Sequence, residues 1–517
     1  MSFLDPANVA AAPADWDVLR QVTLWREEAI FGHRLWARQN PWLLFLEFLN
    51  VAEAHHRAAA LFSQTEPDRM YRYALRYRMG LRSILFSDAG GDALTSSLDG
   101  ESAWQRWSEE MKDAVDPPPE GFGYVRERFR DFEDFADLVG LVRQSALEST
   151  VRRWSSRFIF PFGVNALYSD AITTSGRAAR DYNVFGRTGE ILYYMVSRAS
   201  RAAELAPFFE KLFDPQQPKN RLVALLCAPS DDDANALQQG NSFLPYRRHP
   251  AFERLVEDWL NVIALGLPGQ DAFAHLAPLA SLHVLLYQLE TAAAWAGKPR
   301  PSLICEIIAP RRELVRQRSI ASFYDNEDLG RQAANAYVEA VIAREGWPVA
   351  DDALDDSERL EAARAQLVRG FHYDPKSFDA ASPEDLRVQF DQAGDAKYEE
   401  NWSDVHSAYG RYIGLVSRRA TNRYRYAPTD ALLKTLVMAR VPRRLEFSKF
   451  LSDLYVQYGL VLGPEEARMA LPETAFDPAA FLANRERLEA RLASMGLLKR
   501  LSDGCAYVLN PFGAKPA

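Results

Sequence analysis

The C-terminal part of the chain, residues 428–512, constrains the fold most, because three helical patterns in it precede a hairpin pattern. Apolar residues recur at three- and four-residue steps in 432–437, 447–458 and 481–495, as on one face of a helix. Asp503-Gly504 then separates two short apolar runs, and Asp-Gly favours a tight turn because it accepts positive φ. Three helices followed by a hairpin predict a winged-helix domain.

A local excess of positive charge overlaps the start of this domain. Residues 418–449 contain nine Lys or Arg against Asp430 and Glu446, whereas the whole chain has a net charge of −9. A basic cluster of this kind is typical of phosphate contact, and two arginines of the third helix lie on one flank. The predicted DNA-binding residues are Arg418, Arg419, Arg423, Arg425, Arg443, Arg444, Arg487 and Arg491. The alternative is that the domain only docks onto a neighbouring protein.

The rest of the chain predicts a mainly α, multi-domain protein with a few short strands. A length of 517 residues suits two to four domains. Helices are expected at 41–62, 67–86 and 122–147, among others, and strands at 221–227 and 302–309. The expected units are an N-terminal helical domain (1–116), a central mainly helical domain with short strands (120–345), a helical connector (346–427) and the winged helix (428–517).

Composition narrows the possible location and chemistry. Three widely spaced cysteines, 227, 305 and 505, form neither a disulfide framework nor a zinc motif, and suit a reducing cytosol. Charged residues interrupt the most apolar windows, so no membrane span and no signal peptide are expected. The sequence contains no P-loop, dinucleotide-binding or nucleophile-elbow motif. We therefore expect a cytoplasmic protein without cofactor, metal or catalytic residues.

The sequence also contains two weaker candidate sites, one for an anion and one for a metal ion. Arg187, Thr188 and Gly189 stand at the predicted start of a helix, where backbone amides can hold an anion, although a plain loop capped by Thr188 fits as well. Asp170, Asp181 and Glu190 are the carboxylates that a metal-dependent nuclease could use, yet their spacing matches no metal motif. His275 and His283 are two helical turns apart on apolar stretches, which favours packing roles over a shared metal.

Three segments, 158–168, 185–194 and 497–511, resemble long uncharacterised bacterial proteins encoded in anti-phage defence operons. The resemblance carries no catalytic residues. It implies a cytoplasmic accessory subunit that works near DNA, with the other subunits of a defence complex as partners. The resulting hypothesis is a non-catalytic subunit that contacts duplex DNA and partner proteins. The alternatives are a metal-dependent nucleic-acid-processing enzyme and a pure protein scaffold.

Overall fold

The computed structural model describes most of the chain, and within the described residues the protein is mainly helical with short strands, as predicted. The described residues are 4–13, 26–32, 40–75, 79–86, 91–94, 100–112, 120–144, 171–174, 177–180, 187–229, 237–239, 242–268, 271–308, 314–347, 355–372, 378–398, 402, 404–418, 423–502 and 505–513.

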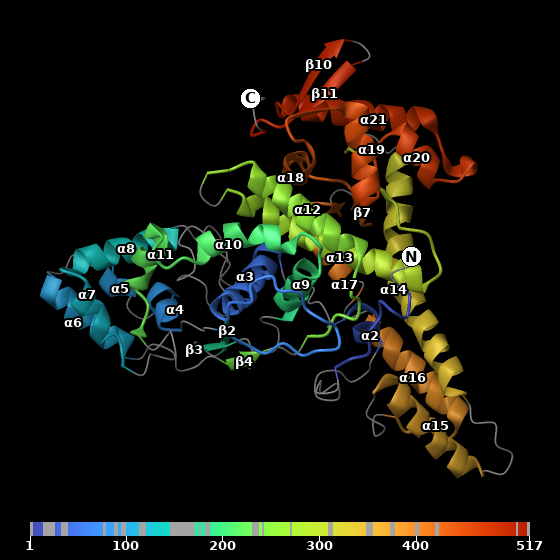
Figure 1. Cartoon of the computed structure of the whole chain (residues 1–517), viewed down its shortest axis with the longest axis horizontal. Helices are drawn as coiled ribbons and strands as arrows, with labels where there is room; N and C mark the ends of the chain where they lie inside the picture. Colours follow the sequence, from blue (N-terminus) through green and yellow to red (C-terminus); the bar gives the residue numbers. More distant parts are fainter. Residues whose placement is uncertain are drawn as a thin grey trace.

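Two buried helices form the centre of the molecule, α3 (Pro41–Arg57) and α13 (Phe273–Trp295), which pack against each other (Figure 1). Asn40 begins α3 by accepting a hydrogen bond from the Leu43 amide, and proline occupies the first helical position. Nearly every side chain of α13 is buried, which is typical of a helix surrounded by protein on all sides. The other helices of the body are α2 (Glu27–Phe31), α9 (Arg187–Ser197), η3 (Ala202–Leu205), α10 (Ala206–Phe213), α11 (Pro218–Ala224), α12 (Pro250–Ala264), α14 (Leu314–Glu345) and α17 (Asp404–Tyr412).

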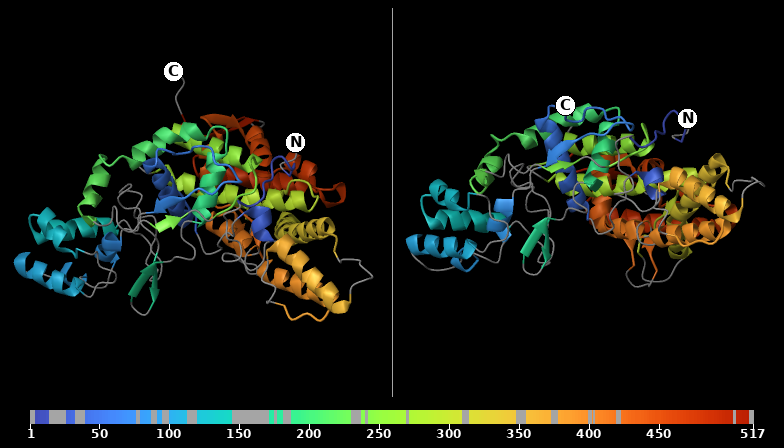
Figure 2. Two further views of the ribbon diagram at one scale, coloured as in Figure 1. Left: turned by 60° about the horizontal axis from the view of Figure 1, so that its bottom comes forward. Right: turned by 90° about the horizontal axis from the view of Figure 1, so that it is seen from below.

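Two smaller helical units extend from this body, as Figures 1 and 2 show. The first is built on an aromatic cluster in which Trp104 stacks on Phe135 at 5.2 Å and Trp107 meets the same ring edge-on at 4.9 Å. In the second, the C-terminal end of α14 packs with two helices around Phe371 and Phe390. Their helices are α4 (Met79–Phe86), α5 (Gly91–Leu94), α6 (Gly100–Met111), α7 (Gly123–Arg128) and α8 (Phe132–Gln144) in the first, and α15 (Asp356–Phe371) and α16 (Pro383–Tyr398) in the second.

Apart from the three-stranded sheet of the C-terminal module, the described strands form four separate pairs. Three pairs are antiparallel and the pair β5–β9 is parallel, so none of them extends into a larger sheet among the described residues. The strands are β1 (Tyr73–Leu75) with β4 (Leu237–Gln239), β2 (Ala171–Thr174) with β3 (Arg177–Arg180), β5 (Leu303–Ile304) with β9 (Leu460–Val461), and β6 (Val416–Ser417) with β7 (Arg425–Tyr426).

The C-terminal module, residues 428–513, combines helices with a three-stranded antiparallel sheet of order β10-β11-β8. The predicted hairpin is confirmed, with Leu498 opposite Val508 and Arg500 opposite Ala506; its turn residues lie outside the described residues. The elements are α18 (Asp430–Arg440), β8 (Arg444–Glu446), α19 (Phe447–Tyr458), β9, α20 (Pro464–Ala470), η7 (Glu473–Ala475), α21 (Pro478–Ser494), β10 (Leu498–Ser502) and β11 (Cys505–Leu509).

The module is firmly joined to the body. β9 pairs with β5, and the Asn484 amide nitrogen of α21 donates to the carbonyls of Cys305 and Leu462 at 3.0 and 2.9 Å. One continuous hydrophobic core runs from Ile30 to Val508 and includes residues from each of the four expected sequence ranges. The expected division into domains stays a prediction, because contiguous packing alone does not define folding units.

Three local predictions are wrong. The stretch 67–86 is only helical in α4, because β1 pairs with β4 far along the sequence. The stretch 122–147 contains two helices, α7 and α8, since Phe129 has an extended backbone after α7. The stretch 221–227 belongs to α11 and the turns after it, because Pro218 starts a helix there. The strand expected at 302–309 is confirmed only as the two residues of β5.

Candidate functional site

Two of the predicted DNA-binding arginines form ion pairs within the protein. Arg425 is buried, and its Nε donates to Glu306 Oε2 at 2.5 Å; the other oxygen of this buried carboxylate accepts from Arg316 at 2.7 Å. Arg491 donates to Asp430 at 2.5 Å and to the Pro428 carbonyl at 3.1 Å. Arg425 is therefore not available for phosphate contact, and Arg491 is engaged at the start of α18.

Asp258 on α12 is a second buried carboxylate, and it forms an ion pair with Arg440, another cation of residues 418–449. Arg440 at the end of α18 donates to Asp258 Oδ1 at 3.1 Å, and the Tyr458 hydroxyl donates to Oδ2 at 2.7 Å. His283 Nε2 lies 2.7 Å from the same Oδ2. Burial lowers the pKa of His283, so the imidazole is a neutral hydrogen-bond partner. This cluster joins the module to the body, and it confirms a packing role for His283.

The outward face of α21 is neither basic nor strongly polar. Its exposed positions follow one stripe at helical spacing and include Leu482, which is 45% exposed, and Glu486. The stripe comprises Ala479, Leu482, Glu486, Ala490 and Ala493. Arg487 is only half-buried, but it lies off this stripe. A helix that reads the major groove needs donors on its outer face, and this stripe lacks basic residues.

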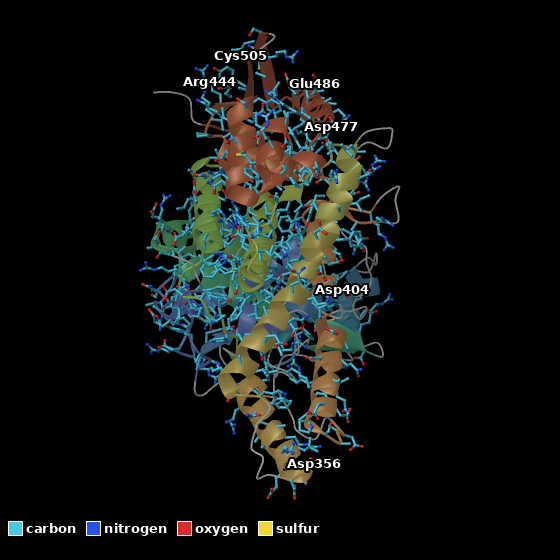
Figure 3. All side chains as sticks on the ribbon, turned by 90° about the vertical axis from the view of Figure 1, so that its right-hand side faces the viewer. Asp356, Asp404, Arg444, Asp477, Glu486 and Cys505 are labelled. Atoms are coloured by element: carbon cyan, nitrogen blue, oxygen red, sulfur yellow. The ribbon has the colours of Figure 1, made fainter. Side chains whose placement is uncertain are left out.

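The cations that remain exposed gather near the three-stranded sheet. Arg444 of β8 lies over the Tyr507 ring of β11 at 5.6 Å, and Lys499 of β10 is directly opposite Tyr507. Glu446 of β8 is also directly opposite Tyr507. Because opposite residues share a face of a sheet, Arg444, Lys499, Tyr507 and Glu446 form one surface, which we call the basic sheet face because its two cations outnumber its one acid. Arg443 is exposed just before β8, and its carbonyl accepts from the Asn510 amide at 2.8 Å. Figure 3 shows Arg444 and Glu486 on opposite sides of the hairpin.

The remaining predicted arginines lie elsewhere. Arg418 is exposed beside Tyr424, with its guanidinium 5.1 Å from the ring centre, and Arg423 is exposed at the start of the segment leading into β7. Arg419 lies outside the described residues. The eight predicted contacts thus do not form one patch, and Arg443 and Arg444 are the pair that the fold places beside another exposed cation and an aromatic ring.

The predicted anion site at the start of α9 is filled by the protein itself. The Gly189 amide donates to the Glu47 carboxylate at 3.1 Å, and Thr188 is buried. A side chain at Gly189 would lie 2.4 Å from the Glu47 carbonyl carbon, so α3 and α9 are in close contact there. The Arg187 side chain is outside the described part of the chain. A carboxylate of α3 therefore takes the place that a bound anion would occupy.

The three acids of the enzyme hypothesis cannot be assembled from the described residues. Asp170 and Asp181 lie outside them. Glu190 is buried and accepts from the Tyr194 hydroxyl at 2.6 Å and from the Ser242 amide at 3.2 Å; burial raises the pKa of this carboxyl. In the described ranges, no three His, Cys, Asp or Glu side chains are close enough to share a metal ion. Glu190 thus has a structural role.

A feature that the sequence patterns did not indicate is a cleft of about 900 Å³ beside α18. It lies between the N-terminal ends of α3 and α18, the first turns of α13, the C-terminal end of α17 and the tail after β11. Its lining includes Trp42, His275, Arg411, Tyr412, Lys434 and Phe512. His275 Nδ1 lies 2.9 Å from Thr435 Oγ1, and burial lowers the pKa of His275 to about 4. Its packing role is therefore confirmed, at the wall of a cleft.

Comparisons with known proteins add no relative. The chain matches no family model, and no curated protein or solved structure is significantly similar to it. Among the described helices, none is both long and apolar enough to cross a membrane.

Proposed function

We propose that residues 428–513 are a winged-helix module and that the chain is a non-catalytic subunit that contacts duplex DNA through the basic sheet face. Helices α18, α19 and α21, with β8 between the first two and a hairpin after the third, follow the order expected of this fold. The sheet order β10-β11-β8 fits as well, because the strand from between the helices pairs with the last strand. α20 is an insertion before the third helix.

The observation that carries the DNA proposal is the placement of Arg444 and Lys499 beside Tyr507 on one sheet face, with Arg443 exposed just before β8. Cations on a sheet face contact phosphates without reading bases. The apolar and acidic stripe of α21 does not favour entry into a groove, so the expected binding is independent of sequence. Arg425 and Arg491, which pair with Glu306 and Asp430, are not among the DNA contacts of this proposal, and Lys499 is added to them.

The test is a salt titration of duplex binding by fluorescence anisotropy, with the wild-type chain and Arg443→Ala/Arg444→Ala. Each phosphate contact contributes a log–log slope of about −0.9, so the double variant should reduce the slope magnitude by up to about 1.8. The matched control is Arg359→Ala/Arg369→Ala on α15, which removes the same charge from exposed positions at the far end of the molecule. No binding at about 50 mM salt, or an equal loss in the control, contradicts the proposal.

The stripe of α21 supports a second proposal, a contact with a partner protein, which the scaffold alternative also requires. Leu482 is 45% exposed, and three alanines share the stripe with it, so the stripe offers a small apolar surface to a partner. Leu482→Asp should abolish co-purification of the partner, whereas Leu501→Asp, at a position 59% exposed on β10, should retain it. Equal retention by both variants contradicts this contact. Membership of an anti-phage defence complex stays a prediction from the resemblance.

A further inference from the structure

The cleft beside α18 has the size and the lining of a small-ligand site. Its volume of about 900 Å³ lies within the range of about 300–1,000 Å³ that ligand pockets occupy. Five separate segments contribute to it, and all its lining residues belong to the described part of the chain. Four of these segments contribute residues to the continuous core, which holds most of the cleft wall in place.

Two cations give the cleft a preference for anions. Arg411, at the end of α17, and Lys434, on α18, are exposed and line the space; neither forms an ion pair with a carboxylate of the described residues. Asp271 is the acidic residue of the lining. Arg440, by contrast, is neutralised by Asp258 and Asp453. Arg411 lies over the Tyr424 ring at 5.9 Å, a contact that leaves its charge uncompensated, so both cations at this concave surface are available to an anionic ligand.

The geometry of α18 strengthens this preference. Thr429 and Ala431, from the N-terminal end of this 11-residue helix, line the cleft, where the helix dipole is positive. Asp430, in the same turn, is not part of the lining, because Arg491 binds it at 2.5 Å. The ion pair therefore removes from the cleft the one acid that would oppose an anion at this helix end.

Three aromatic side chains complete the lining. Tyr412 and Phe512 are 47% and 46% exposed, which is high for rings of this size, and Trp42 is half-buried. Exposed aromatic faces beside cations suit a flat ring that carries a negative group, because stacking and charge pairing act on different parts of one molecule. A nucleobase joined to phosphate has this chemistry.

We propose that the cleft beside α18 binds a free nucleotide, with Arg411 and Lys434 contacting its phosphates and the aromatic side chains contacting its base. The site is separate from the basic sheet face and does not rest on the proposed DNA contact. It would make the chain a nucleotide-responsive subunit, since the ligand would touch α3, α13 and α17 of the body together with α18 of the module.

Isothermal titration of the full chain with AMP, ADP, GDP and UDP tests the proposal, with adenosine and pyrophosphate as partial ligands. At least one nucleotide should bind saturably, and more tightly than either partial ligand. Arg411→Ala/Lys434→Ala should weaken nucleotide and pyrophosphate binding at least tenfold and leave adenosine binding unchanged. Tyr412→Ala, at an exposed ring that should not be needed for folding, should weaken nucleotide binding and leave pyrophosphate binding unchanged.

A control variant separates the cleft from general electrostatics. Arg359→Ala/Arg369→Ala removes the same charge at α15 and should retain wild-type nucleotide affinity. Absence of saturable binding for all four nucleotides at low millimolar concentration overturns the proposal. An equal loss in the control variant, or equal binding of nucleotide and pyrophosphate, overturns it as well.

Discussion

Replacing Arg425 with alanine should damage folding and not DNA binding. The change leaves the buried Glu306 carboxylate with Arg316 as its ion-pair partner. Removing one member of a buried ion pair typically costs about 3–5 kcal/mol, because the remaining charge is desolvated and uncompensated. Since Arg316 remains at 2.7 Å, we expect the lower end, about 3 kcal/mol of unfolding free energy.

The assay is urea denaturation followed by tryptophan fluorescence, with DNA anisotropy measured on the same folded sample. Arg425→Lys should lose less stability than Arg425→Ala, because it keeps a positive charge beside the buried Glu306 carboxylate. Arg418→Ala, at an exposed predicted DNA contact, should change stability by less than about 0.5 kcal/mol. An unchanged urea midpoint for Arg425→Ala together with a smaller salt slope would refute the reasoning and restore this residue to the DNA surface.

Three further predictions follow from buried groups. Asp258→Asn should cost about 3 kcal/mol, the lower end of the range for a buried ion pair, because Arg440 keeps Asp453 and Glu257; an unchanged melting temperature contradicts this. Gly189→Ala should lower the free energy of unfolding by about 1–3 kcal/mol because of overpacking against α3, whereas Gly140→Ala, where a side chain meets nothing within 4 Å, should not; urea denaturation measures both. Burial lowers the pKa of His249 and of His406 to about 3. The unfolded chain therefore binds protons that the folded chain does not, and stability should fall as pH decreases from about 6.5, by up to about 1.4 kcal/mol per pH unit for each histidine. His406→Gln should reduce this slope in urea titrations at several pH values.

The sequence predicted correctly those helices and strands that are determined by neighbouring residues in the chain. The hairpin β10–β11 follows from its turn chemistry and two apolar runs. Helices α3 and α12 follow from apolar spacing and a proline at the first helical position. Helix α13 follows from its apolar character along the whole segment. The segment 67–86 was mispredicted because β1 is determined by a partner strand more than 160 positions away. A helical pattern in the sequence carries no information about such a partner.

The candidate site was less predictable for the same reason. Counting cations over residues 418–449 could not reveal that Glu306, 119 positions earlier, neutralises Arg425. Nor could it show that Arg491 turns toward Asp430. The cleft was missed entirely, because its walls come from segments between Asn40 and Phe512 that only the fold brings together. A local excess of positive charge in the sequence predicts a basic surface only when the buried carboxylates that pair with some of these cations are known.

The long helix α14 connects two distant parts of the molecule. Its 32 residues span about 48 Å at 1.5 Å per residue, from α21 at one end to α15 and α16 at the other. Near its middle, Gly330 lies so close to the Trp402 ring that a side chain there would approach within 2.4 Å. One continuous helix therefore links α15–α16 to the C-terminal module, and the Trp402 ring packs closely against its middle (Figure 3).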